Sequence, residues 1–573
     1  MCKLPEEKKK KWTGGDLVVR ALVNENVRFI FGVPGGQLLH IYDAVYQWGR
    51  EEGIDTIMFR HEQAAAHAAD AWARVTGTIG VCMGTVGPGA THMLPGIAAA
   101  WSDSIPVMVI TPQVTINQMD IGFLQGDLDQ LAIYRPVVKY QKQILKTERI
   151  LEYLQRGFRE ALSGRPRPVH IDIPFDILAG KIEGDIPCIE PEHYRVGSNS
   201  PGNPGLVERA VDLLLAAKKP LVIAGGGILS AKAEQELQEF VKYLQLSLIT
   251  TVMGSSAILK GTSAYIGGPG VLTSNTQKAL SETDLVIAFG TRFGLSLMFG
   301  KPPLWREDLP LIHIDIDPCE IGKNRPVEVG IVGDCKLVLQ QMLNLLKKKR
   351  RPIQEETDWL KTLKEAREKY WMGLQKKMNS DNVPILPQRL IHEIDEFLDE
   401  NAIVIVDGGD IAFFALEQIQ MYHPRKVLQS IGMGHLGTSI PYAIGTKLAA
   451  PDRQVCTISG DGAIMINIQE LETAKRYKLP FICVVANNNA WGMIKSGQKY
   501  SFKKRFIDVD FTDTNFAEIA QGFGCYGERI TDPNEIRPAL ERAQKSKVPA
   551  VLDVVIKFVT HDFSKMGLEA MLF

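Results

Sequence analysis

The sequence predicts an α/β protein made of three consecutive doubly wound parallel-sheet domains. With 573 residues, the chain is too long for one hydrophobic core and suggests about three domains of ~150–200 residues each. Short apolar runs alternate with helix-like segments, as strands and crossover helices do in parallel sheets. A Pro/Gly/Ser-rich stretch and a charged stretch separate the alternating regions. We therefore expect domains at residues 13–184, 206–345 and 387–559, followed by a tail at 560–573.

The first expected domain has two polar turns that follow buried strands. Its expected strands are residues 27–31, 57–59, 79–85, 107–110 and 169–173, and its helices include 15–24 and 64–74. The tripeptide His61-Glu62-Gln63 follows one strand and leads into an Ala-rich helix. Considered alone, Glu62 is a helix-start carboxylate that the helix dipole favours. Another strand runs into the turn Gly87-Pro88-Gly89.

The second expected domain contains a glycine run after its first strand. We expect strands at residues 220–224, 248–251, 285–289 and 311–316. The run Gly225–Gly227 is not a GxGxxG fingerprint, and no acidic residue follows convincingly about 20 positions later. A nicotinamide dinucleotide site is therefore disfavoured.

The third expected domain contains a strand, helix and strand around residues 459–493. We expect strands at residues 403–406, 456–459 and 481–486 and helices at 443–449 and 468–477. In a βαβ crossover the carboxyl ends of both strands lie at one edge of the sheet. Asp461 and Asn488, 27 residues apart, should therefore lie close together.

These two residues suit a metal and a diphosphate. A carboxylate, an amide oxygen and a backbone carbonyl form a hard oxygen set of the kind that Mg²⁺ prefers. The adjacent residues Gly460 and Gly462 let the backbone approach a diphosphate closely. Without this pairing, Gly-Asp-Gly would be an ordinary turn.

Composition excludes several function classes. A formal net charge of −1 gives no reason to expect nucleic acid or an anionic membrane as partner, and the basic clusters at 8–11 and 347–351 suit solvated charge. The eight cysteines have no CxxC spacing, which suits free thiols in a reducing compartment. Neither a signal-peptide pattern nor an apolar run of the ~18–20 residues that span a membrane is present. We expect a cytoplasmic protein.

The combination of Gly-Asp-Gly with the Asn pair across a βαβ crossover resembles the signature of the thiamine diphosphate (ThDP) enzymes. This resemblance implies that Asp461, Asn488 and the carbonyl of Ala490 hold Mg²⁺, and that Glu62 activates the cofactor. It also implies two cofactor-binding turns, one near Gly87 and one near Leu436. The residues expected to contact ThDP are Pro34, Gly35, Gly87, Pro88, Gly409, Met433, Gly434, Leu436, Gly460, Asp461, Gly462, Ala463, Asn488, Ala490, Trp491, Gly492 and Met493.

The resemblance also implies a mechanism. Glu62 would hydrogen-bond the aminopyrimidine, whose imino nitrogen then forms the C2 ylide, provided that a buried site keeps the carboxyl protonated for part of the cycle. Leu436 would bend the cofactor so that this nitrogen lies against C2. Attack on a 2-oxo acid and loss of CO₂ would give an enamine that an acceptor carbonyl captures. Gln125 would hydrogen-bond the developing alkoxide.

Within this superfamily the chain is most similar to the acetolactate synthase group. That group has Phe-Gln-Glu where this chain has Leu124-Gln125-Gly126, and a substrate-facing Trp where this chain has Gly497. The QGD, DQ and RP-x-x-K features resemble oxalyl-CoA decarboxylase and 2-hydroxyacyl-CoA lyase. We therefore expect a 2-oxo acid substrate, with an acyl-CoA substrate as the alternative. A catalytically silent ThDP-fold partner is disfavoured because Glu62 and Asp461 are present.

Several points stay open in the sequence. Residues 289–293 and 314–324 resemble the middle domain that holds FAD or a nucleotide such as ADP in relatives, but an empty structural domain is an equal alternative. The superfamily implies at least a homodimer, as a homodimer or homotetramer. His92 stands where the family often has Asn; it and His435 are either proton carriers or structural. We assign Asp410 no phosphate role, and we expect the tail to dock or to act as a lid.

Overall fold

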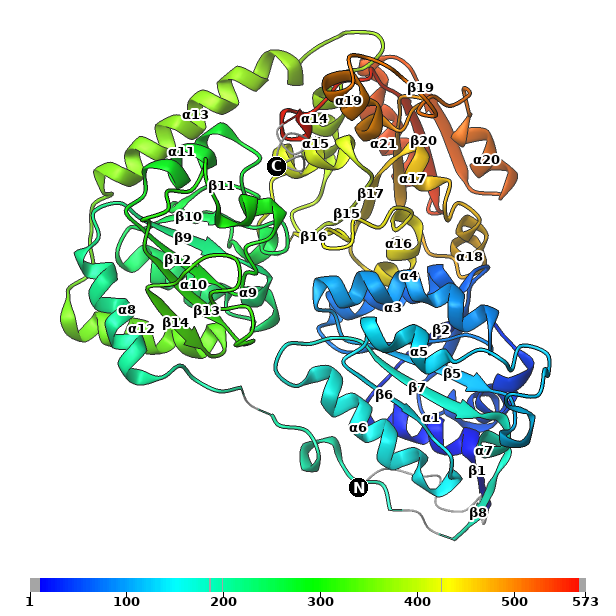
Figure 1. The fold of residues 1–573 in the computed structure, drawn as a ribbon. Helices are drawn as coiled ribbons and strands as arrows, with labels where there is room; N and C mark the ends of the chain where they lie inside the picture. Colours follow the sequence, from blue (N-terminus) through cyan, green and yellow to red (C-terminus); the bar gives the residue numbers. More distant parts are fainter. Residues whose placement is uncertain (1–10, 185–186, 198, 424, 566–573) are drawn as a thin grey trace. The chain divides into compact units, whose positions relative to one another are not determined.

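The computed structural model describes residues 11–184, 187–197, 199–423 and 425–565. They form two compact units. The first unit combines the residues up to 197 with Ser430–Asp452 and Ile466–Pro480, and the second combines 199–429, Arg453–Met465 and the residues from Phe481 onward. Together the units contain three six-stranded parallel sheets flanked by helices, which confirms the predicted fold class (Figure 1).

The first unit is built on the N-terminal sheet, with strand order β3-β2-β4-β5-β7-β6. These strands are β2 (Phe29–Gly32), β3 (Asp55–Met58), β4 (Gly80–Met83), β5 (Val107–Gln113), β6 (Tyr140–Gln143) and β7 (Val169–Pro174). A separate antiparallel pair joins β1 (Lys11–Thr13) and β8 (Lys181–Glu183). The helices are α1 (Gly14–Asn24), α2 (Leu39–Ala44), α3 (Glu62–Thr76), α4 (Pro88–Asp103), α5 (Gln130–Tyr134), α6 (Ile150–Leu162), α7 (Phe175–Ala179), α16 (Ser439–Ala449) and α18 (Glu470–Arg476).

The second unit contains the middle sheet, with strand order β11-β10-β9-β12-β13-β14. Its strands are β9 (Pro220–Ala224), β10 (Ser247–Thr250), β11 (Tyr265–Gly267), β12 (Leu285–Phe289), β13 (Leu311–Asp315) and β14 (Val329–Val332). The surrounding helices are α8 (Pro204–Ala216), α9 (Gly226–Ser230), α10 (Glu234–Tyr243), α11 (Ser274–Glu282), α12 (Cys335–Lys349) and α13 (Asp358–Met378). The last two occupy much of the charged stretch after the second expected domain.

The second unit also contains the C-terminal sheet, with strand order β16-β15-β17-β18-β20-β19. Its strands are β15 (Ile403–Asp407), β16 (Lys426–Leu428), β17 (Val455–Gly460), β18 (Ile482–Asn487), β19 (Tyr526–Ile530) and β20 (Ala550–Val555). Its helices are α14 (Pro387–Phe397), α15 (Asp410–Gln418), α17 (Asp461–Ile464), α19 (Gly492–Ser501), α20 (Phe516–Gly522) and α21 (Ile536–Lys545).

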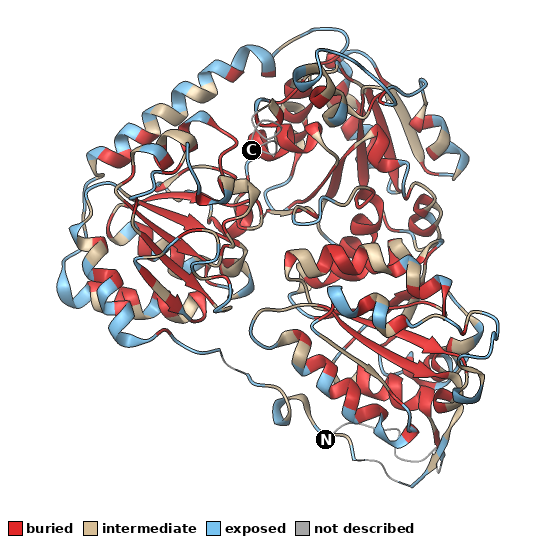
Figure 2. Cartoon of the chain, in the orientation of Figure 1, coloured by how far each residue is buried: buried red, intermediate tan, exposed pale blue. Residues whose placement is uncertain are grey.

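Burial explains why the central strands read as apolar runs in the sequence. Strands such as β7, β12 and β18 are buried along their whole length, because helices cover both faces of a parallel sheet (Figure 2). Edge strand β6 is only half-buried. The expected strands all lie within about two residues of observed ones at their starts, whereas β6, β11, β14, β16, β19 and β20 were not among those expected.

Some expected bounds were wrong for identifiable reasons. Helix α16 begins four residues earlier than expected, at Ser439, because Pro441 fits the first turn of a helix. The short helix α17 follows β17 directly and was not among the expected helices. No disulfide bond joins the seven cysteines in the described part of the chain, and five of them are buried. Among the described helices, none combines the length and apolarity that crossing a membrane requires.

Candidate functional site

Helices begin at the carboxyl ends of three neighbouring strands of the C-terminal sheet. Strand β17 pairs in parallel with both β15 and β18, as the predicted crossover requires. Helices α15, α17 and α19 start just beyond these strands, at Asp410, Asp461 and Gly492. The first amide groups of a helix have no partner inside that helix and favour anions. This edge of the sheet therefore offers several backbone donors in one place.

The side chain of Asp461 joins two of these strand ends. Its Oδ1 accepts a hydrogen bond from the Gly462 amide at 2.8 Å, and its Oδ2 accepts from the amides of Asn488 and Ala490, both at 3.1 Å. The carboxyl group is buried, and this burial raises its pKa, while the backbone hydrogen bonds lower it. The structure thus brings the three predicted metal-binding positions together at the ends of β17 and β18.

The side chain of Asn488 supplies an unsatisfied oxygen at this place. Its Oδ1 is buried, with no hydrogen-bond partner in the part of the chain that the structure describes. A buried amide oxygen without a partner is costly, and such groups usually meet an ion, a ligand or water. Together with the carboxylate of Asp461 and the backbone of Ala490, it forms a donor set of hard oxygens that fits Mg²⁺.

Two glycines allow the remaining predicted residues to close around this edge. A Cβ atom on Gly462 would lie 2.6 Å from the ring of Trp491, and a Cβ atom on Gly409 would lie 2.8 Å from the Cβ of Met493. A larger residue would therefore displace the side chains of α19 and the loop before it. The predicted positions Gly409, Gly460–Ala463, Asn488 and Ala490–Met493 all come from this one edge.

Asp410 has hydroxyl partners at the start of α15. Its Oδ2 accepts a hydrogen bond from the Ser496 hydroxyl at 2.8 Å, and its Oδ1 accepts one from Ser564. Burial raises the pKa of Asp410, and the two hydroxyl donors oppose this rise. The carboxylate is thus engaged by α19 and by the C-terminal segment.

The described part of the tail docks on α15. Phe563 is buried and packs edge-on against Phe413, with ring centroids 4.8 Å apart. The hydroxyls of Thr560 and Ser496 lie 2.8 Å apart. The expected apolar tail contacts at Met566, Leu568, Met571, Leu572 and Phe573 lie outside the described residues.

In the first unit, Glu62 is the first residue of α3, directly beyond β3. The preceding residue, His61, caps the helix, since its Nδ1 accepts a hydrogen bond from the Gln63 amide at 3.2 Å. The Glu62 residue is buried, and its Oε2 lies 2.9 Å from Nδ1 of His92 on α4. Glu62 was predicted at the site, the role of His92 was left open between a proton carrier and a structural residue, and their contact was not predicted.

Helix α18 holds the backbone that leads into Glu62. The buried carboxylate of Glu470 accepts hydrogen bonds from the amides of Arg60 at 3.2 Å and His61 at 3.1 Å, and from the Thr473 hydroxyl at 2.6 Å. Burial raises the pKa of Glu470 to about 7, against the effect of these donors. Glu470 was not predicted from the sequence. The pattern that could have identified it is a carboxylate on the same helical face as Thr473 and Tyr477.

The turn at Gly87 is supported from behind. Gly87 has a φ of 70°, a left-handed conformation that favours glycine, and a Cβ atom there would lie 3.1 Å from Cβ of Gln125. Its amide donates to Oε1 of Gln130 at 3.0 Å, and Nε2 of Gln130 donates to Asp172 at 3.1 Å. Burial raises the pKa of Asp172 to about 7. Glu62, Gly87 and Gln125 thus gather at the carboxyl edge of the N-terminal sheet.

The predicted Leu436 loop belongs to the same unit. Met433 is 54% exposed, Gly434 has a φ of 63°, and Leu436 is half-buried. Nδ1 of His435 lies 2.7 Å from the carbonyl oxygen of Leu436, and its ring centroid lies 4.7 Å from that of His67 on α3. Burial lowers the pKa of His435. These contacts hold the ring of His435 between its own loop and α3.

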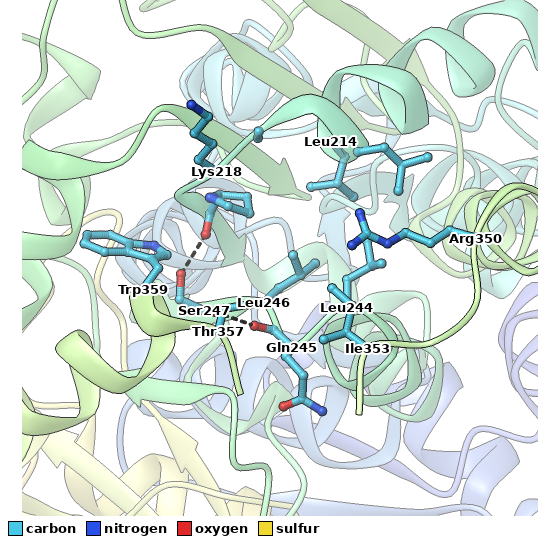
Figure 3. Close-up of a pocket in the computed structure, with 13 residues that line it drawn as sticks. Leu214, Lys218, Leu244, Gln245, Leu246, Ser247, Arg350, Ile353, Thr357 and Trp359 are labelled. Atoms are coloured by element: carbon cyan, nitrogen blue, oxygen red, sulfur yellow. Dashed lines mark hydrogen bonds between the residues drawn. The ribbon is translucent and has the colours of Figure 1, made fainter. Parts of the chain in front are cut away.

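The middle sheet uses its glycine run for packing. A Cβ atom on Gly227 would lie 2.6 Å from Cα of Gly290, so the backbone after β9 lies against the backbone after β12. A cavity of about 160 Å³ lies instead at the amino ends of β9 and β10, where Ser247 donates to the Pro220 carbonyl at 2.7 Å (Figure 3). Open α/β sheets bind ligands at the opposite, carboxyl edge.

Comparison with known proteins agrees with these observations. Three family models match consecutive parts of the chain. The N-terminal TPP binding domain of thiamine pyrophosphate enzymes matches residues 12–133, the central domain matches 207–342, and the C-terminal TPP binding domain matches 407–554. Thiamine pyrophosphate is another name for ThDP, so the cofactor expected from the sequence is the one that these domains bind.

Curated relatives cover nearly the whole chain. A probable acetolactate synthase large subunit from Methanococcus aeolicus is 36% identical, over 95% of this chain and 92% of its own. Acetolactate synthase isozyme 3 large subunit from Escherichia coli is also 36% identical, over 93% and 92%. A probable acetolactate synthase large subunit from Methanocaldococcus jannaschii is 35% identical, over 95% and 92%. The chain therefore belongs to the thiamine pyrophosphate enzymes, in the group of the acetolactate synthase large subunits.

Proposed function

We propose that this protein uses ThDP and Mg²⁺ to decarboxylate a 2-oxo acid and to join the remaining fragment to an acceptor carbonyl, as an acetolactate synthase does. The observation that carries this proposal is the buried oxygen set of Asp461 and Asn488. A silent ThDP-fold partner has no need to keep an unsatisfied buried oxygen beside a buried carboxylate, because both are costly without a ligand. The names of the curated relatives support the same reaction class.

The metal and the diphosphate would be held by the edge of the C-terminal sheet. Asp461, Asn488 and the Ala490 carbonyl would bind Mg²⁺, which completes its shell with water and phosphate oxygens. Because Gly409, Gly460 and Gly462 have no side chain, their backbone would be able to approach the diphosphate closely. Backbone amides at the starts of α15 and α19 would offset its negative charge.

Three residues would act at the reacting end of the cofactor, namely Glu62, Leu436 and Gln125. When bound, ThDP supplies the electron sink for the carbanion that the reaction requires. Glu62 would hydrogen-bond the aminopyrimidine and hold the proton that is exchanged there. Leu436 would support the bent form of the cofactor. Gln125, beside Gly87, would donate a hydrogen bond to the substrate oxygen as charge develops on it.

The decisive experiment is a mass-spectrometric analysis of products from pyruvate, other 2-oxo acids and 2-hydroxyacyl-CoA thioesters, with ThDP and Mg²⁺ present. We expect CO₂ and a hydroxy-oxo acid from a 2-oxo acid. Cleavage of an acyl-CoA alone would assign the protein to the alternative lyase class. Matched reactions with Glu62→Gln should give neither product, and full activity of that variant would contradict the assigned role.

The assembly, the compartment and the middle domain complete the proposal. We infer that the protein is cytoplasmic. We also infer that it forms a homodimer or homotetramer, because ThDP enzymes build each site from two chains. Sedimentation of the purified protein checks the oligomeric state, and a monomer with full activity would contradict this inference.

Bound FAD in the middle domain would show as flavin absorbance in the purified protein, and ADP would appear in the extract of denatured protein. Absence of both would leave the middle domain as a structural element.

A further inference from the structure

A histidine and a glutamate form a close pair at the start of α3 and α4. Nδ1 of His92 lies 2.9 Å from Oε2 of Glu62. The side chain of Glu62 is only 11% exposed, whereas that of His92 is 45% exposed. The buried carboxyl group is therefore linked by one hydrogen bond to a titratable side chain that reaches solvent.

From this geometry we propose that His92 is a positioning residue, which orients the carboxyl group of Glu62 and exchanges its proton with water. The inference rests on the proposed function, in which Glu62 hydrogen-bonds the aminopyrimidine of ThDP. It extends that function, because the chemistry of Glu62 requires a proton to reach and leave a buried carboxyl group.

The hydrogen bond fixes which oxygen faces the cofactor. Since an ionised carboxylate only accepts hydrogen bonds, we assign a proton to Nδ1 of His92, which then donates to Oε2 of Glu62. In the part of the chain that the structure describes, Oε1 has no hydrogen-bond partner. Oε1 is therefore the oxygen that remains for the aminopyrimidine, and His92 limits the rotation of the carboxyl group about its last bond.

The proton exchange balances without any further reactant. A proton passes from Nδ1 of His92 to the carboxylate of Glu62, while Nε2 takes up a proton from water, so the ring remains neutral. The reverse transfer restores the first tautomer when the carboxyl group gives its proton back. Imidazole suits this task because both ring nitrogens exchange protons near neutral pH.

Other charged and titratable groups face the pair. The ring of His61 stacks on that of His92, with centroids 4.5 Å apart, and both burial and the nearby His92 lower the pKa of His61. The remaining groups are less direct, since they act on Glu62 through space or on the backbone before it. They are Tyr42, Tyr134, Arg60 and Glu470.

The same cluster also contains atoms that could bind a metal ion, so a metal site is the alternative to the hydrogen-bonded pair. One ligand atom each of His61, Glu62 and His92 lies within 4.8 Å of the others. However, the two rings are stacked with an angle of 27° between them, and Nδ1 of His61 accepts a hydrogen bond from Gln63. A ring stacked on its neighbour does not direct its nitrogen to a shared ion, so we favour the hydrogen-bonded pair.

The first test uses the protein without cofactor. Nitrogen NMR of histidine-labelled protein reports which ring nitrogen of His92 carries the proton, and the signal is assigned by its loss in His92→Asn. We expect the Nδ1–H form in the wild type and a return to the Nε2–H form, which free histidine favours, in Glu62→Ala. An Nε2–H form in the wild type would overturn the proposal. Saturable Zn²⁺ binding that is lost in both His61→Asn and His92→Asn would also overturn it.

The second test measures exchange of the ThDP C2 proton against pH. His92→Leu removes both the orientation of the Glu62 carboxyl group and the proton exchange with water. In this variant we expect exchange of the C2 proton to slow about ten- to a hundredfold. His92→Asn keeps a donor near the Nδ1 position but cannot titrate. It should bind ThDP normally, exchange slowly, and recover with added imidazole. The matched control is His193→Asn, since His193 is an exposed histidine 3.7 Å from Glu192.

The outcomes separate this inference from the proposed function. Wild-type exchange in Glu62→Gln would remove the assigned role of Glu62, and the role of His92 with it. Slow exchange in Glu62→Gln together with a wild-type rate and pH profile in His92→Leu would overturn only the role of His92. Slow exchange in His92→Asn that imidazole does not restore would leave orientation in place but refute the proton transfer.

Discussion

Oε1 of Gln130 accepts a hydrogen bond from the amide of Gly87 at 3.0 Å, which places a buried side chain directly behind the turn that would face the cofactor. Nε2 of the Gln130 side chain donates hydrogen bonds to Asp172 and to the Pro112 carbonyl. Gln130 therefore connects the turn to strands β5 and β7. Gln130 belongs to the DQ feature, Asp129-Gln130, that resembles the acyl-CoA enzymes. Its hydrogen bonds give this feature a structural role that does not depend on the substrate.

Replacing Gln130 with alanine should destabilise this turn. The Gly87 amide would lose its partner in a buried place, which costs about 1–3 kcal/mol. We expect a lower thermal midpoint and weaker ThDP binding, measured by calorimetric titration. The control is Gln47→Ala, which removes an exposed side chain bonded to Asp43 and should change stability by less than about 0.5 kcal/mol. Equal affinities of both variants for ThDP would contradict the role of Gln130.

Replacing Asp461 with alanine should abolish Mg²⁺-dependent binding of ThDP. The change removes the carboxylate that would bind the metal, and it also frees the amides of Asn488 and Ala490. We expect affinity to fall at least about a hundredfold, since changes even to the partners of metal ligands cost ten- to a hundredfold. Calorimetry with and without Mg²⁺ measures this. Asp510→Asn is a suitable control, because Asp510 is exposed and pairs with Lys495; an unchanged affinity in Asp461→Ala would refute the metal assignment.

The pH dependence of stability should report Glu470. Its pKa in the folded protein, about 7, lies above the ordinary value of 4.5, so the folded state holds this proton more tightly than the unfolded state does. The stabilisation is therefore complete below about pH 4.5 and is lost as the pH rises through 7, by about 3 kcal/mol at most. Glu470→Gln should lose the part of this dependence that comes from Glu470 and keep the part from Asp172, whose pKa is also raised to about 7. Thermal midpoints measured from pH 5 to pH 8 would reveal the reduced dependence.

Glu472 provides the opposite control on the same helix. The hydrogen bond from Arg476 lowers the pKa of Glu472, so its contribution is present above the ordinary value and is lost as the pH falls. Glu472→Gln should therefore leave the difference between pH 5 and pH 8 unchanged. If Glu470→Gln kept the wild-type dependence, the titrating group would lie elsewhere.

Replacing Ser564 with alanine should loosen the docked C-terminal segment. The buried carboxylate of Asp410 would lose one hydroxyl donor, at a cost of about 1–3 kcal/mol. Hydrogen exchange followed by mass spectrometry should show faster exchange in residues 556–565 and at the start of α15. Ser281→Ala is the matched control, because Ser281 bonds only a carbonyl on the exposed face of α11. Unchanged exchange in both regions would contradict the docking.

The fold class and the central strands could be predicted because burial leaves a clear pattern. Strands β9 and β12 lie at the residues expected from their apolar runs. The missed strand β6 reads Tyr-Gln-Lys-Gln and is half-buried, since an edge strand packs less of its surface. Strand β20 is central, but Asp553 interrupts its apolar run. That aspartate is satisfied by Asn487 and by the Phe516 amide, which no local pattern indicates.

The candidate site was predictable where the backbone alone brings residues together. The parallel pairing of β17 and β18 is enough to place Asp461 beside Asn488. The contacts of Glu62 with His92, of Glu470 with His61 and of Gln130 with Gly87 depend instead on side chains from segments far apart in the sequence. Periodicity carries no information about such pairs, so their partners required the three-dimensional structure.

The hydrogen bonds from the amides of Arg60 and His61 to Glu470 limit how this protein can be recombined with its relatives. Residues 466–480 are close in sequence to Asp461 and Asn488, yet they pack in the unit that contains Glu62. A chimaera that takes its C-terminal third from another enzyme would also replace the support beneath the N-terminal glutamate. Such a hybrid would need a carboxylate and a hydroxyl at positions 470 and 473, whichever parent provides the rest.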